Sequence, residues 1–153
     1  MKRILMIVAL MGTALLASDG FAQSKGKQAE PRQAVEGDEI WVVVNTIKAD
    51  KREQFEKWVF EIFWPAGMKL PAKERAVFEQ TRVLRPIKAN ADGTWTYIYL
   101  MDPLIPGAEY NISRLLKRMF DEAKAQEYGR MMFETYAKPQ TSYDMKQGRS
   151  LNQ

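Results

Sequence analysis

The sequence contains no histidine and no cysteine among its 153 residues. These absences exclude a histidine-based triad, a cysteine nucleophile, a disulfide framework and the usual Cys/His zinc sites. We also find no glycine-rich phosphate loop and no acidic residues at the spacing of a Ca²⁺ or Mg²⁺ site. A general base would have to be a carboxylate or a lysine. The sequence therefore predicts no bound metal and no cofactor.

Blocks of like charge and long hydrophobic runs are also scarce. The formal net charge is +4 without a basic block, so we expect no nucleic-acid partner. Beyond the N-terminal residues, no segment is long and apolar enough to cross a bilayer. A hydrophobic content of 46% is enough for the core of one domain.

The N-terminal residues have the pattern of a secretory signal. Lys2 and Arg3 precede an apolar segment at 4–16, and Ala22 ends a small-x-small exit. The alternative is an uncleaved membrane anchor, but the apolar core has about 13 residues where about 20 are needed to span a bilayer. We predict a signal peptide at 1–22, export to the periplasm or outside the cell, and no stable membrane anchor after cleavage.

One strand followed by one amphipathic helix organises the rest of the chain. Residues 40–47 are mostly β-branched and apolar on both alternating faces, which favours a strand covered on both sides. Residues 50–64 have the 3.6-residue period of a helix, which Pro65 is expected to end. Phe60 and Trp64 fall on the opposite side of this helix. They are expected to contact a loop, the C-terminal segment or a partner.

The remaining pattern gives the order of the other elements. Strict alternation makes 94–101 the clearest strand of the chain. The other predicted segments, in chain order, are a flexible leader at 23–38, a loop at 66–75, a strand at 76–86, a hairpin connection at 89–93, a helix at 110–123 continuing towards 136, a strand at 140–146 and a tail at 148–153.

This order, strand-helix-strand-strand-helix-strand, predicts a ferredoxin-like α+β fold for residues 39–147. Its sheet would be antiparallel, with both helical connections on one face. Because the first strand is apolar on both faces, the second face of the sheet also needs a cover. A second copy of the same sheet would provide it, so we expect a homodimer.

The opening segment 41–55 and the order of elements resemble those of the dimeric α/β-barrel superfamily, in particular the antibiotic-biosynthesis monooxygenase-like domains. The resemblance covers 39–146 and brings no catalytic motif with it. It implies sheet-to-sheet dimers with a cavity against the sheet. Some haem-degrading members carry an asparagine on the first strand, which Asn45 matches, but they also need a histidine for the iron. This chain has no histidine, so the resemblance does not extend to haem chemistry.

Five residues are the candidate ligand-binding residues. Asn45 interrupts an apolar strand and would be either buried with hydrogen-bond partners or at the solvent end of the strand. Trp95, Tyr97 and Tyr99 share one strand face and would form either a ligand wall or a dimer interface. Arg82, in the neighbouring strand, would pair with an anionic ligand or with solvent.

The function favoured at this point is the binding of a small apolar or aromatic molecule in a sheet-lined cavity. One alternative is a cofactor-independent monooxygenase-like enzyme, in which Asn45 and a tyrosine would converge on one point of a closed pocket. The other alternative is a structural or interaction protein without catalysis. No catalytic residue is assigned. Glu79, the only carboxylate well inside a predicted strand, is expected to be exposed.

Overall fold

The computed structural model describes residues 32–149. The predicted signal peptide at 1–22 and the start of the leader lie outside the described residues. Four strands form one sheet in the order β2-β3-β1-β4, and each strand is antiparallel to its neighbours. The strands are β1 (Glu39–Ile47), β2 (Thr81–Leu84), β3 (Trp95–Met101) and β4 (Thr141–Lys146).

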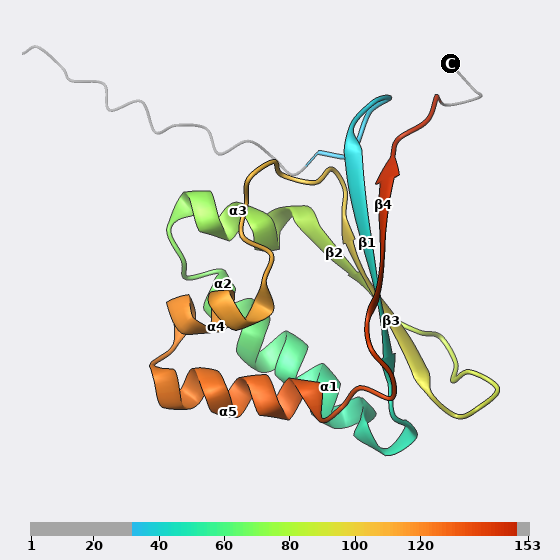
Figure 1. The fold of residues 1–153 in the computed structure, drawn as a ribbon, viewed down its shortest axis with the longest axis vertical. Coiled ribbons are helices and arrows are strands. Elements are labelled where there is room, and N and C mark those ends of the chain that lie inside the picture. Colours follow the sequence, from blue (N-terminus) through green and yellow to red (C-terminus); the bar gives the residue numbers. More distant parts are fainter. Residues whose placement is uncertain (1–31, 150–153) are drawn as a thin grey trace, which may run out of the picture.

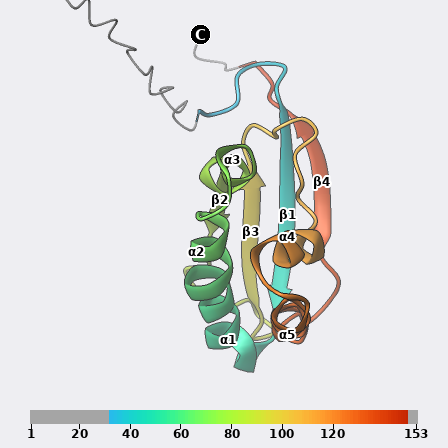
Figure 2. The same ribbon diagram turned by 90° about the vertical axis from the view of Figure 1, so that its left-hand side faces the viewer.

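Helices fill both crossover connections and lie on one face of the sheet (Figures 1 and 2). This architecture confirms the predicted ferredoxin-like α+β fold. Within residues 32–149, no helix has the length and apolar character needed to cross a membrane. The connection from β1 to β2 contains η1 (Ala49–Lys51), α1 (Arg52–Lys57), the π-helical segment η2 (Trp58–Phe63), α2 (Trp64–Gly67) and α3 (Ala72–Gln80), and that from β3 to β4 contains α4 (Ile112–Met119) and α5 (Glu122–Phe133).

Alternation along β1 and β3 decides which side chains meet the helices. Val43 lies opposite Tyr99 and Asn45 opposite Tyr97 in the antiparallel register, and all four side chains are buried. Ile47, at the end of β1, is also fully buried. These residues form the sheet side of the core, which α1 and η2 complete with Phe55, Trp58, Val59 and Phe63. The strong periodicity seen in the sequence therefore corresponds to one core between the sheet and the helices.

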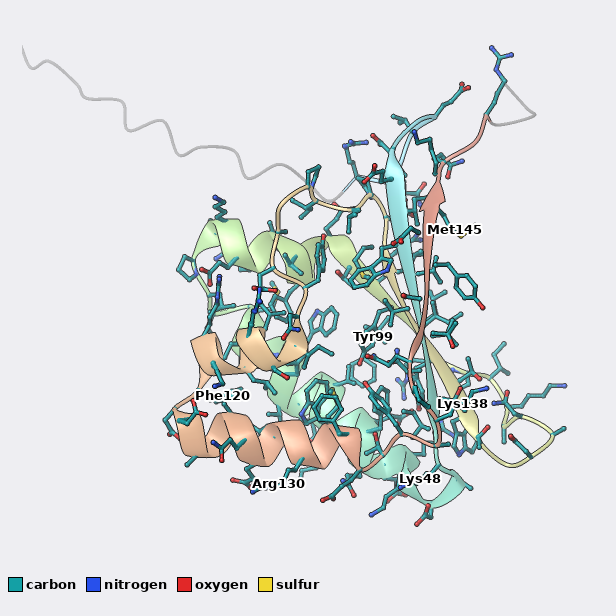
Figure 3. The ribbon with its side chains drawn as sticks, viewed as in Figure 1. Lys48, Tyr99, Phe120, Arg130, Lys138 and Met145 are labelled. Carbon is teal, nitrogen blue, oxygen red and sulfur yellow. The ribbon has the colours of Figure 1, made fainter. Side chains whose placement is uncertain are left out.

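The opposite face of the sheet carries no helix in the described part of the chain (Figure 1). We call it the outer sheet face. Side chains of all four strands contribute to it, and Leu84, Tyr143 and Met145 are 44%, 53% and 55% exposed. Figure 3 shows Met145 on this side of the sheet, away from Tyr99, which lies between the sheet and the helices. By strand alternation and register, the apolar residues of the outer sheet face are Ile40, Val42, Val44, Leu84, Ile98, Leu100, Tyr143 and Met145.

The π-helical segment changes which residues of the first helical connection face the core. A π-helix has wider turns than an α-helix, so residues after it are rotated relative to an α-helical projection. Trp64 is consequently half-buried and packs against Phe78 and Tyr99, although the α-helical period placed it on the outer side. Pro65 does not end the helix: it lies in α2, which continues directly from η2, and the chain stays helical to Gly67.

The predicted strand at 76–86 is wrong in its first half. Residues up to Gln80 belong to α3, and only Thr81–Leu84 are extended. An ion pair from Arg75 to Glu79 at i,i+4 supports the helix, and Phe78 packs against Trp64. Glu79 is therefore on a helix, half-buried and paired with Arg75, and not exposed on a strand.

The second helical connection is also divided where the sequence pattern continues. α4 ends at Met119, and Phe120 and Asp121 have extended backbone angles. The Asp121 side chain then accepts a hydrogen bond from the backbone N–H of Lys124, which caps α5. The predicted helix at 110–123 is thus divided between α4 and the start of α5, because the capping aspartate starts a new helix in the middle of an apolar period.

Residues 32–38 were predicted as part of the flexible leader, and they make several hydrogen bonds to the domain. The backbone N–H of Gly37 donates to the carbonyl of Gln147, and that of Ala34 donates to Oδ1 of Asp102. Arg32 also pairs with Asp38 at 2.6 Å. The end of the leader is therefore held beside β1 and the residue after β4.

Candidate ligand cavity

A cavity of about 350 Å³ lies between the inner face of the sheet and the helices. Its volume is at the lower end of the range for small-molecule sites. No aspartate, glutamate, lysine or arginine is among the described residues that line it. Most of its wall is apolar or aromatic and includes Trp41, Val43, Phe63, Trp64, Phe78 and Met101.

Tyr99 gives this apolar cavity a polar group without a partner. The residue is 7% exposed and lines the cavity, and its hydroxyl has no hydrogen-bond partner among the described residues. Burial raises the pKa of Tyr99 well above its usual value, and the nearby Tyr136 and Tyr97 add to the shift. The hydroxyl therefore stays protonated and is a donor that lacks an acceptor. The other buried side-chain atom of this kind in residues 32–149 is Nε1 of Trp58, which does not line the cavity.

The helical wall opposite Tyr99 consists of packed aromatic rings. The Trp64 ring lies 6.3 Å from that of Tyr99 and makes an edge contact with Phe78 at 5.5 Å. Phe63 packs against Phe78 at 5.2 Å. Phe78 can take this position because Gly67 in α2 has no Cβ; an added Cβ would overlap the Phe78 ring. The wall is therefore closely packed and depends on one close contact between α2 and α3.

The rim of the cavity can be recognised by the lining residues that remain exposed, namely Asn111, Ser113, Phe133 and Gln140. They belong to the start of α4, the end of α5 and the residue before β4. The exposed lining residues therefore place the opening of the cavity between the second helical connection and β4. β4 is the edge strand on the side of α4 and α5, and all its residues are exposed (Figure 2).

Asn45 is fully buried and hydrogen-bonded, which decides between the two interpretations of this residue. Its Nδ2 donates to the backbone carbonyls of Val43 and Tyr97 at 3.3 and 3.4 Å. Its Oδ1 accepts from Nε2 of Gln140 at 2.5 Å, and the same nitrogen donates to the hydroxyl of Tyr136 at 3.1 Å. Asn45 does not line the cavity, but it holds Gln140, which does.

Tyr97 and Trp95 lie further along the same face of β3, away from the cavity. The Tyr97 hydroxyl donates to Oε1 of Glu56 at 2.5 Å, and burial together with this carboxylate raises the pKa of Tyr97 to about 12. Arg85 and Arg52 also bind Glu56, at 3.1 and 3.2 Å. Burial alone would raise the pKa of Glu56, but hydrogen bonds from Tyr97, Arg85 and Arg52 together outweigh burial and lower it.

The aromatic face of β3 is therefore not available to a second sheet, because it faces the helices. Trp95 donates from Nε1 to the carbonyl of Ala49, and Arg52 lies over its ring at 4.1 Å. Of the three residues, Tyr99 alone lines the cavity. Arg82 lies on the outer sheet face, opposite Leu100, and its guanidinium forms an ion pair with Asp102. The structure thus brings Tyr99 and, through Gln140, Asn45 to one place, and leaves Trp95, Tyr97 and Arg82 outside it.

Most of the cavity residues were not among those predicted from the sequence, and Trp64, Phe78 and Gln140 show why. Trp64 was assigned to the wrong side of its helix and Phe78 to a strand, for the reasons given above. Gln140 has no sequence signal of its own, because its position depends on a contact with Asn45, 95 residues earlier in the chain.

No protein-family model matches the chain, and no curated protein matches it significantly. Among solved structures, the chain is similar to the crystal structure of a protein from Caulobacter crescentus that is described as a candidate antibiotic biosynthesis monooxygenase. The two chains are 17% identical, and the match covers 74% of this chain and 92% of the other with a TM-score of 0.41. This is a resemblance at the level of the fold alone.

Proposed function

We propose that the protein binds a small, uncharged apolar or aromatic group in the cavity beside Tyr99. The single observation that carries this proposal is the unpartnered, buried hydroxyl of Tyr99 in a largely apolar wall without a charged side chain among the described residues. A buried donor without an acceptor costs about 1–3 kcal/mol. A ligand with an acceptor oxygen or nitrogen removes this cost, while the aromatic wall binds its hydrocarbon part. A charged group inside the cavity would lack a counter-ion.

A direct test uses N-phenyl-1-naphthylamine, an uncharged fluorophore that brightens in apolar surroundings. We expect saturable binding by residues 23–153 and competition by 1-naphthalenemethanol. Ser113→Trp places a large ring at the rim of the cavity and should reduce binding at least about tenfold by blocking the opening. Lys117→Trp, one turn later on the exposed side of α4, is the matched control and should bind like the parent. Equal binding by all three proteins would contradict the proposal.

The enzymatic alternative is a cofactor-independent monooxygenase-like reaction. Asn45 and Tyr136 do converge, but on Gln140 and not on an open point of the cavity. Burial raises the pKa of Tyr136, so its hydroxyl is not a base near neutral pH. Because no carboxylate or lysine of residues 32–149 lines the cavity, binding is favoured over proton abstraction. Oxygen consumption with a bound hydroxylated naphthalene would reverse this preference.

We further propose that the protein is exported and forms a homodimer through the outer sheet face. The signal pattern at residues 1–22 supports export. Support for the dimer comes from a continuous apolar surface over all four strands, with Leu84, Tyr143 and Met145 about half exposed. Light scattering of residues 23–153 should give twice the chain mass. A monomer at micromolar concentration would contradict the dimer and leave the cavity proposal standing.

A further inference from the structure

A shallow hollow adjoins the cavity at its rim and differs from it in charge. Trp41, Tyr110 and Asn111 line both, so the two spaces meet along these residues. The hollow also contains Glu109 and Asp144, and no lysine or arginine of residues 32–149 lines it. An uncharged, largely aromatic cavity therefore adjoins an acidic hollow at the surface.

Asp144 is the carboxylate that remains open to a ligand. It lies opposite Trp41 in the register of β1 and β4, so both side chains point to the helix side of the sheet. No ion pair or hydrogen bond of Asp144 is present among the described residues. The nearest lysine on the same strand face, Lys146, lies opposite Glu39 in the register and forms no ion pair with Asp144.

Glu109 contributes less than Asp144 to the binding of a cation, because its carboxylate already accepts two hydrogen bonds. Its Oε1 accepts the backbone N–H of Asn111 at 2.9 Å, and its Oε2 accepts from Arg114 at 3.3 Å. These contacts lower the pKa of Glu109 and keep it ionised at the edge of the hollow. It adds negative potential without offering a free pair of oxygens.

Two aromatic rings separate the hollow from the cavity. Trp41 and Tyr110 make an edge contact with centroids 5.8 Å apart and an interplanar angle of 78°. The Tyr110 hydroxyl accepts the backbone N–H of Ile105 at 3.0 Å, which fixes the ring against the loop before α4. Aromatic faces next to a carboxylate are a favourable environment for an ammonium group.

We propose that the ligand is a cationic amine with an aromatic or apolar body. The body occupies the cavity beside Tyr99, and the ammonium group lies in the hollow between Asp144 and the Trp41–Tyr110 pair. This inference rests on the proposed function, because it requires that the cavity bind the body of the ligand. The two spaces match such a molecule in charge: no charged side chain of residues 32–149 lines the cavity, and two carboxylates line the open hollow.

The test compares three compounds that differ in one group: 1-naphthylmethylamine, 1-naphthalenemethanol and 1-naphthoate. Each displaces N-phenyl-1-naphthylamine from residues 23–153. We expect the amine to bind about threefold to tenfold more tightly than the alcohol, the size of a partly exposed ion pair with a cation–π contact. The carboxylate should bind more weakly than the alcohol. Added salt should reduce the preference for the amine.

Asp144→Asn removes the charge and keeps the shape of the side chain, and it should bring the amine down to the level of the alcohol. Asp50→Asn, an equal change of charge at the other end of β1, is the control and should keep the preference. An amine that binds no better than the alcohol, or a preference that survives in Asp144→Asn, overturns the inference while the proposed function stands. Failure of the fluorophore and of all three compounds would overturn both.

Discussion

The Nε2 atom of Gln140 lies 2.5 Å from Oδ1 of Asn45, joining the residue before β4 to the C-terminal part of β1. The contact is local in space and remote in sequence. Asn45 is fully buried, so its oxygen depends on this single donor for the hydrogen bond that water would otherwise provide. The hydrogen bond between Gln140 and Asn45 therefore fixes one side of the cavity rim as well as the start of β4.

Gln140→Ala should destabilise the protein by about 1–2 kcal/mol, because a buried acceptor then loses its donor. Chemical denaturation monitored by tryptophan fluorescence gives the free energy of unfolding. Gln126→Ala, at an exposed position of α5 where the side chain bonds Glu122 one turn earlier, is the control. It should change stability by no more than about 0.5 kcal/mol. Equal effects of the two substitutions would show that water replaces Gln140 at Asn45.

Gly67→Ala should be strongly destabilising, by about 1–3 kcal/mol, because the added methyl group overlaps the Phe78 ring. Phe78 also forms part of the cavity wall, so we expect weaker fluorophore binding in the protein that still folds. Gly148→Ala is the control, since nothing lies within 4 Å of a Cβ added there. A neutral Gly67→Ala would mean that α2 and α3 move apart freely.

How much of the fold and of the cavity could be predicted from the sequence depends on how far apart in the chain the interacting residues lie. The strict alternation of 94–101 and the apolar first strand predicted β3 and β1, and the order of elements predicted the fold. Tyr99 was predicted as a site residue because side-chain alternation is a local property. The prediction could not say which face of β3 the helices cover, and this decided that its aromatic residues face the core.

The parts that failed depend on packing between segments. The β propensity of Val77 and Phe78 favoured a strand, but contacts with Trp64 and the absence of a side chain at Gly67 favour the helix. The π-helical segment has no sequence signature and rotates Trp64 into the cavity wall. Arg82 was predicted to pair with an anionic ligand or with solvent, and its pairing with Asp102, after β3, on the outer sheet face likewise could not be read from the sequence.

Tyr97→Phe should weaken the alkaline loss of stability. Burial and the Glu56 carboxylate raise the pKa of Tyr97 from 10.0 to about 12 in the folded state. Its contribution to stability is therefore complete below pH 10 and is lost as the pH rises from about 10 to about 12. Tyr97→Phe lacks this contribution to stability, whereas the buried Tyr99 and Tyr136 keep their own contributions. The fall of the free energy of unfolding with rising pH therefore becomes less steep but does not vanish.

The measurement is the free energy of unfolding at a series of pH values across that window. Tyr143→Phe, which removes a half-exposed hydroxyl from the outer sheet face, is the control for the loss of one tyrosine. At neutral pH, Tyr97→Phe should also cost about 1 kcal/mol, because Glu56 loses a donor. An unchanged alkaline slope would show that the hydrogen bond to Glu56 does not hold the phenol in its neutral form.

Tyr99→Phe should have the opposite effect at neutral pH. Since the Tyr99 hydroxyl has no partner, its removal should leave the free protein equally stable or up to about 1 kcal/mol more stable. The same variant should bind 1-acetonaphthone, which carries a carbonyl acceptor, about threefold to tenfold more weakly than the parent, while naphthalene binding stays unchanged. A loss of stability without ligand would show that the hydroxyl already has an acceptor.

Leu100→Lys should convert the proposed dimer into a monomer. Leu100 lies on the central strand β3, opposite Val42 on one side and Arg82 on the other, so it occupies the middle of the outer sheet face. A lysine there would have to lose its hydration in a dimer, facing the same charge from the second copy. Light scattering should then give the mass of one chain. Ile87→Lys makes the same kind of change in a fully exposed loop position and should leave the dimer intact. If Leu100→Lys stayed dimeric, the interface would have to lie elsewhere, and the outer sheet face would need a different partner.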